Sequence, residues 1–168
     1  MIELCGTASS YFADAKRAVR TWPGLVNWGQ SLLILAAFVV ATLTINKVEP
    51  LFKFAVTDDL QALLAIAAVA FFIPALAEEL IFRVVLGGRT GRVRAALAMA
   101  AFMLWHPIQV WLDLPMAQAL FLEPAFLAVT AALGLAGTLA YRMSGSVWPA
   151  VMIHWLVVIG WKGVTAPV

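Results

Sequence analysis

The stretch ALAEELIFRVV, residues 75–85, places two carboxylates and a guanidinium in a run that is otherwise apolar. Ionised groups are costly to bury, and they are retained inside apolar segments where they are paired or take part in function. The interpretation of Glu78, Glu79 and Arg83 therefore depends on the residues around them. On the N-terminal side no charged residue occurs back to residue 60, and on the C-terminal side the apolar run ends before Arg89.

The rest of the chain is apolar enough for a membrane protein. Of its 168 residues, 64% are hydrophobic and 12% are charged, about half the charged share of a soluble domain. Five windows contain no Asp, Glu, Lys or Arg: 21–46, 60–77, 95–112, 124–141 and 143–161. Each is close to the ~20 residues that a helix needs to cross a bilayer, and none alternates like a barrel strand. The sequence predicts an all-α, polytopic membrane protein with about five transmembrane helices.

The first 25 residues differ from the spans that follow. They carry Lys16, Arg17 and Arg20 beside aromatic residues, and they lack the apolar core of a cleavable signal. We expect residues 1–25 to form a cytoplasmic, interfacial segment and residues 26–165 to form one membrane domain. A single cysteine, Cys5, excludes an internal disulfide and a cysteine-based metal site.

The basic residues indicate the orientation in the membrane. With the N-terminus in the cytoplasm, seven basic residues lie on the cytoplasmic side and three outside, which is a positive-inside pattern. The seven are Lys16, Arg17, Arg20, Arg89, Arg92, Arg94 and Arg142, and the three are Lys47, Lys53 and Lys162. The formal net charge of +2 is thus a topology signal and does not indicate nucleic-acid binding.

Three ionisable side chains are expected at a similar depth in the membrane. With a rise of about 1.5 Å per residue, Glu78 lies roughly 10–15 Å, His106 roughly 13–18 Å and His154 roughly 10 Å from the cytoplasmic ends of their helices. Ionisable residues in spans usually face a bundle interior or an aqueous cavity, so we expect a shared site. The alternative is that the chain's two histidines are unrelated, each bonded to a neighbouring carbonyl.

Helix geometry separates the two glutamates. Adjacent residues point about 100° apart, and Glu79 precedes Arg83 by four residues, the spacing that favours an ion pair. Glu78 has no such partner, so we expect its carboxylate to face the cavity and serve as a general base. Pro74 and Pro107 should each favour a kink beside the site.

Three motifs in this order are similar to those of a known family. EELIFR (residues 78–83) fits EExxxR, FMLWH (residues 102–106) fits FxxxH, and SGSVWPAVMIH (residues 144–154) resembles a Ser-x-Trp-Pro run leading to a second histidine. Over roughly residues 60–160 the chain resembles the CPBP family of intramembrane proteases, also called the CAAX protease and bacteriocin-processing or Abi family. Residues 26–165 are accordingly identified as a CPBP-like intramembrane protease domain.

The resemblance implies hydrolysis of a peptide bond in a membrane-associated peptide or protein tail. It implies that Glu78 and His106 activate a water molecule and that His154 stabilises the oxyanion. The residues implied to support the site are Glu79, Arg83 and Phe102. The implied substrates are a prenylated CAAX tail, a leader peptide or the C-terminal sorting tail of an exported protein. The implied location is the prokaryotic inner membrane, with the bilayer and the substrate as partners and no nucleic acid.

Metal dependence is left open by the residues themselves. Glu78, His106 and His154 would make a three-ligand zinc set with one open position. No HExxH motif is present to preset that geometry, and the resemblance implies a glutamic-type protease. We therefore favour a site without a cofactor, with zinc as the alternative.

One departure from the family pattern bears on activity. The family's third motif continues as HxxxN or HxxxD, whereas Val158 stands four residues beyond His154 and can donate no hydrogen bond. Gln109, Trp105 or a backbone amide could supply the missing oxyanion donor. The alternative function is a non-catalytic membrane protein of the same fold, an immunity factor or a scaffold.

Overall fold

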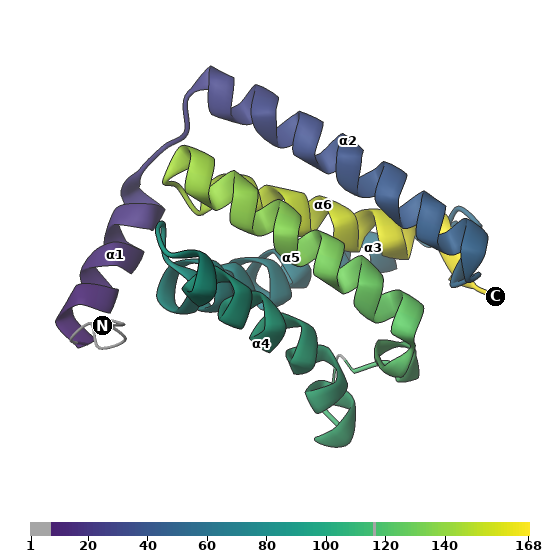
Figure 1. Ribbon diagram of the computed structural model, residues 1–168. Helices are drawn as coiled ribbons and strands as arrows, with labels where there is room; N and C mark the ends of the chain where they lie inside the picture. The colour runs from purple at the N-terminus through teal and green to yellow at the C-terminus, as the bar shows by residue number, and fades with distance from the viewer. Residues whose placement is uncertain (1–7, 116) are drawn as a thin grey trace.

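The structure, a computed structural model, describes residues 8–115 and 117–168 (Figure 1). Cys5 and the other residues of 1–7 lie outside the described residues. The α-helices are α1 (Ala8–Arg20), α2 (Leu25–Val48), α3 (Leu60–Ala70), α4 (Arg92–Trp111), α5 (Pro124–Ser144) and α6 (Trp148–Val164). Two π-helical segments, η1 (Phe71–Leu76) and η2 (Glu79–Gly87), follow α3, and the 3-10 turn η3 (Ala119–Leu122) precedes α5. Strands β1 (Phe52–Phe54) and β2 (Thr165–Pro167) pair antiparallel.

The helices have the lengths of membrane spans. α2, the continuous stretch Leu60–Gly87, α4 and α5 are each long and apolar enough to cross a bilayer. α6 is apolar but has 17 residues, which is the lower limit for a crossing helix. The all-α, polytopic membrane fold is confirmed, and the expected count of about five spans corresponds to four full-length helices and this shorter one.

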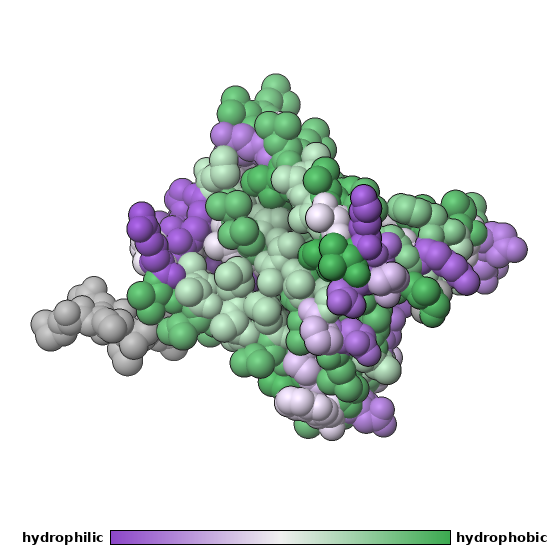
Figure 2. Space-filling model, turned by 45° about the vertical axis from the view of Figure 1, so that its right-hand side comes forward, coloured by the Kyte–Doolittle hydropathy of each residue, from purple (hydrophilic) through white to green (hydrophobic). Residues whose placement is uncertain are grey.

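Large apolar side chains cover the outside of the bundle. Leu25, Leu33, Val40, Leu64 and Leu97 are 90%, 73%, 64%, 62% and 58% exposed. Figure 2 shows apolar residues over most of the face in view, with hydrophilic residues gathered in separate patches. A surface of this kind faces lipid, because hydrocarbon solvates apolar side chains and the helices satisfy their own backbone groups.

α5 is the central helix of the bundle. It packs against α2, α4 and α6 (Figure 1). Of its most apolar 18-residue window 44% is buried, against 11–28% for the other three full-length spans. The core contributed by these helices includes Phe102, Leu133, Ala136, Ala140 and Val151. The site described below lies against this core.

The residues expected in the cytoplasm meet at one end of the bundle. α1 contacts the start of α6, where Val147 N donates to Ala18 O at 3.2 Å and Trp148 Nε1 donates to Val19 O at 2.8 Å. At the same end Arg142 donates to carbonyl oxygens after η2, among them that of Gly91 at 2.7 Å. These segments would lie at the same end if successive helices cross the bundle in opposite directions, as they do in Figure 1. Which end faces the cytoplasm stays a prediction.

The helix that carries EELIFR is broken once. Ile73 has φ −136° and ψ 113°, outside the helical region, and directly precedes Pro74. Proline disfavours a helical conformation of the residue before it and has no amide hydrogen to donate. The break expected at Pro74 is present, whereas α4 continues through Pro107 as one helix to Trp111. Glu78 follows the break by just over one turn.

Candidate active site

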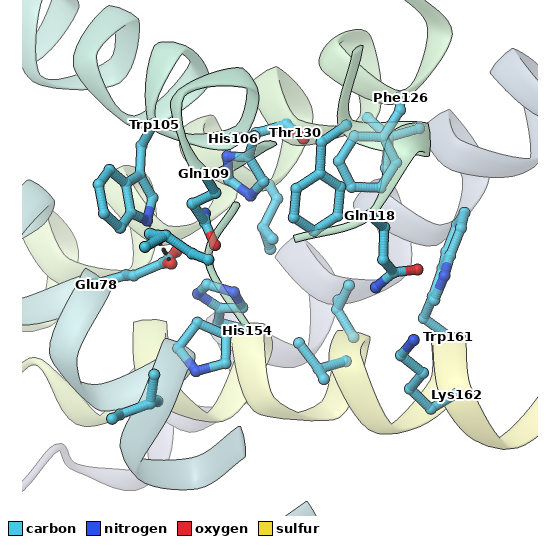
Figure 3. A pocket seen from close by; sticks show the side chains of 18 of the residues that line it. Glu78, Trp105, His106, Gln109, Gln118, Phe126, Thr130, His154, Trp161 and Lys162 are labelled. Carbon is cyan, nitrogen blue, oxygen red and sulfur yellow. Dashed lines mark hydrogen bonds between the residues drawn. The ribbon is translucent and has the colours of Figure 1, made fainter. Parts of the chain in front are cut away.

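A cavity of about 450 Å³ lies between the helices (Figure 3). Glu78, His106 and His154 all line it, so the structure brings the three predicted catalytic residues together. The other residues of the wall with polar side-chain atoms are Trp105, Gln109, Gln118, Thr130, Trp161 and Lys162, and the rest of the wall is mostly apolar. Figure 3 shows two ends, which we call the Glu78 end, with Glu78 and His154, and the Lys162 end, with Gln118 and Lys162.

The Glu78 carboxylate is held from α4. Its Oε1 accepts a hydrogen bond from Trp105 Nε1 at 2.9 Å, and its Oε2 is buried with no hydrogen-bond partner among the described residues. A buried acceptor without a partner carries a cost of about 1–3 kcal/mol. Oε2 is therefore suited to receive a proton or a hydrogen bond from a water molecule or a polar group of a substrate.

His106 has a defined tautomer. Its Nδ1 lies 3.0 Å from the carbonyl oxygen of Phe102, one turn earlier on α4. Because a carbonyl only accepts, Nδ1 carries the proton and Nε2 carries the lone pair in the neutral ring. Phe102 is fully buried and lies edge-on to the rings of His106 and His154, with centroids 5.1 Å and 6.0 Å away. Nε2 of His106 thus remains available as a base.

Glu79 joins two partners. Arg83 Nε donates to its Oε2 at 2.8 Å and Arg83 Nη2 to its Oε1 at 3.3 Å, so the ion pair expected from the spacing is present. His154 Nδ1 lies 3.0 Å from the same Oε1. The guanidinium also stacks over Phe102, 4.2 Å from the ring centroid. Sequence reasoning missed the contact between Glu79 and His154, because 75 residues separate them and no local spacing signals the pairing.

The partner of His154 determines what its ring can do. A carboxylate accepts, so Nδ1 carries a proton that it donates to Glu79. Nε2 then accepts in the neutral ring and donates only when the ring carries both protons. Glu79 therefore positions His154, in addition to pairing with Arg83.

The Glu79–Arg83 pair fits against α5 because residue 137 is glycine. A Cβ there would lie 2.7 Å from Glu79 Oε2 and 3.0 Å from Arg83 Nε. We expect Gly137→Ala to displace the pair and to lower the free energy of unfolding in detergent by about 1–3 kcal/mol. The matched control is Gly160→Ala on α6, where an added Cβ meets nothing within 4 Å. Equal stabilities of the two variants would contradict this packing.

The zinc alternative concerns the same three side chains, Glu78, His106 and His154. Within the described ranges, no three His, Cys, Asp or Glu side chains come together in a way that could hold a metal ion. Each histidine uses its Nδ1 for a protein partner, Phe102 for His106 and Glu79 for His154, and keeps Nε2 free, which is also how metal-binding histidines are commonly held. We derive no chemical step through a metal, and the zinc alternative is left to a chelation experiment.

The comparisons with known proteins concern the part of the chain that holds the site. A family model described as type II CAAX prenyl endopeptidase Rce1-like matches residues 60–160. The match spans more than half of the 168 residues and contains Glu78, His106 and His154. None of the curated proteins and none of the solved structures gives a match. The matched range begins at α3 and ends within α6, so α1 and α2 precede it.

Proposed function

Because the chain belongs to the Rce1-like family of type II CAAX prenyl endopeptidases, we propose that it is a glutamic-type intramembrane protease whose attacking water is activated by Glu78 and His106. Membership of the family makes it a membrane protease of the CAAX type. The proposal adds the catalytic residues, the absence of a metal from the reaction, and a location in a prokaryotic inner membrane.

The observation that carries the proposal is the state of the Glu78 carboxylate. One of its oxygens is held by Trp105 and the other has no partner in the described protein. The same cavity is lined by His106, whose lone pair is on Nε2, and by His154. An oriented carboxylate and a neutral imidazole beside one cavity are the groups that general-base activation of water requires.

Each step can be written with these side chains. As the water oxygen attacks the carbonyl carbon of the scissile bond, Glu78 takes up one of its protons, while Nε2 of His106 accepts a hydrogen bond from the other and so orients the water. The carbonyl electron pair moves onto oxygen, and the resulting oxyanion is stabilised by hydrogen-bond donors such as the doubly protonated ring of His154. The C–N bond then breaks and the leaving nitrogen takes the proton that the water gave. The products are a carboxylic acid, which passes its remaining proton to solvent or to the released amine, and that amine, and the site returns to its starting state.

The cavity wall favours an apolar substrate. Val69, Leu133 and Val157 line it together with the aromatic rings of Phe121 and Phe126. A prenylated CAAX-type tail fits this chemistry and the family membership, so we propose it as the substrate. A leader peptide and a C-terminal sorting tail are the competing substrates.

One residue favours a second candidate function. Val158 lines the cavity and offers no donor at the position where the family pattern has Asn or Asp. A non-catalytic scaffold or immunity factor of the same fold would tolerate that change. The two functions differ in whether the purified chain cleaves anything.

The test uses the full chain in proteoliposomes with three fluorogenic reporters: a farnesylated CAAX peptide, a leader-type peptide and a hydrophobic tail fusion. We expect turnover of the farnesylated peptide, a loss of about 10²–10⁴-fold in His106→Ala, and no change after prolonged treatment with EDTA or 1,10-phenanthroline. No turnover of any reporter would overturn the protease and leave the scaffold. Activity lost on chelation and restored by zinc would overturn the metal-free reaction. Preference for another reporter would overturn only the substrate.

A further inference from the structure

We infer that the side-chain amide of Gln109 is an oxyanion donor of this site, serving in place of a donor at position 158. The inference rests on the hydrolysis proposed above and adds a catalytic residue to it. The hydrogen-bond donors at the Glu78 end differ in whether they remain available when the oxyanion forms.

Two donors near the reacting atoms are already engaged. Trp105 Nε1 donates to Glu78 Oε1 at 2.9 Å, so turning it toward an oxyanion would release the general base. The Nδ1 proton of His154 faces Glu79 at 3.0 Å, and its Nε2 donates only in the doubly protonated ring. While the His154 ring is neutral, neither Trp105 nor His154 therefore has a hydrogen-bond donor free for the oxyanion.

Gln109 meets this need. It lies on α4, three residues after His106 and four after Trp105, so the three side chains share one face of the helix. The residue is 8% exposed and lines the cavity, yet its side-chain amide makes no hydrogen bond within the described part of the chain. In Figure 3 the amide points into the cavity on the side of Glu78 and His154.

The remaining polar groups of the wall lie elsewhere. Gln118, Trp161 and Lys162 are at the Lys162 end, and Figure 3 shows Thr130 beyond His106 as seen from His154. The amide of Gln109 can turn about its last bond to present its NH₂ group, because oxygen and nitrogen occupy equivalent positions. As the carbonyl electron pair moves onto oxygen, that NH₂ donates a hydrogen bond and gives up no proton. The bond is released when the C–N bond breaks.

The first test removes the donor and keeps the volume. We expect Gln109→Leu to lower kcat for the farnesylated CAAX reporter by about 10²–10³-fold with little change in KM, because the bond is made only in the transition state. Gln109→Glu keeps the shape but only accepts, so it should lose at least as much. The matched control is Gln61→Leu, an exposed position on α3, which should keep wild-type kcat. A kcat within about threefold of wild type in Gln109→Leu would overturn the inference.

The second test moves the donor to the facing helix. Val158 lines the same cavity four residues after His154, so Val158→Asn introduces a side-chain amide that can donate a hydrogen bond there. In the double variant Gln109→Leu/Val158→Asn we expect kcat to recover by at least about tenfold over Gln109→Leu. No recovery, with unfolding midpoints equal to that of wild type, would overturn the donor role. If both Gln109→Leu and Glu78→Gln retain wild-type turnover, the proposed function itself is wrong. If Glu78→Gln is inactive while Gln109→Leu retains wild-type turnover, the proposed function stands and only the role of Gln109 is wrong.

Discussion

Glu78→Gln is expected to lower kcat for the reporter peptide by about 10²–10⁴-fold while leaving the protein folded. A glutamine at this position has nearly the shape of the glutamate, and its carbonyl oxygen can still accept the hydrogen bond that Trp105 Nε1 gives to Oε1. It cannot take up a proton from water, so the general base is lost. The NH₂ group in place of Oε2 also removes the one buried acceptor of this carboxylate that has no partner in the described protein.

The measurement is turnover in proteoliposomes, with the midpoint of thermal unfolding in detergent recorded for each variant. Glu49→Gln is the matched control, because Glu49 is exposed after the end of α2 and does not line the cavity that holds Glu78. Glu78→Ala should be inactive as well. If Glu78→Gln turned over the reporter within about tenfold of the wild type, the carboxylate would not be the base and the proposed mechanism would be wrong.

Much of the fold follows from local patterns in the sequence. Charge-free windows near the crossing length predicted the membrane helices, and the four-residue spacing of Glu79 and Arg83 predicted their ion pair. The charge-free window of the last span begins at residue 143, whereas α6 begins at Trp148, close to the start implied by the depth of about 10 Å given for His154. Gly145 has φ +68° and ends α5, and Pro149 lies in the first turn of α6. These are the residues that end and start helices, and a count of charges does not detect them.

The finer contacts of the site depend on residues far apart in the chain. Trp105 and Glu78 are 27 residues apart, and His154 and Glu79 are 75 apart. Depth along each helix predicted that three ionisable groups would meet, because rise per residue is nearly constant. It could not predict how each helix is rotated about its axis. That rotation makes Glu79 the partner of His154 and leaves the second oxygen of Glu78 without one.

Arg83→Met is expected to lower the free energy of unfolding by about 3–5 kcal/mol, the largest stability effect that we predict. Arg83 and Glu79 are 1% and 0% exposed, so water cannot replace the guanidinium that faces the carboxylate. Removing one partner of a buried ion pair leaves the other charge uncompensated, and His154 alone would remain beside Glu79. Unfolding in mixed detergent micelles, followed by tryptophan fluorescence, measures the effect. Arg92→Met, at an exposed position at the start of α4, should stay within about 0.5 kcal/mol of the wild type.

The double variant Glu79→Gln/Arg83→Met separates charge from packing. It removes both charges, and the glutamine carbonyl can still accept the hydrogen bond that His154 Nδ1 donates, so most of the stability lost in Arg83→Met should return. The guanidinium also lies 4.2 Å from the centroid of the Phe102 ring, a contact worth about 0.5–2 kcal/mol that methionine replaces only in part. If the double variant were as unstable as Arg83→Met, the uncompensated charge of Glu79 would not be the cause of the loss, and the packing of the Arg83 side chain would be. Recovery would instead show that the charge of Glu79 is what requires an arginine here.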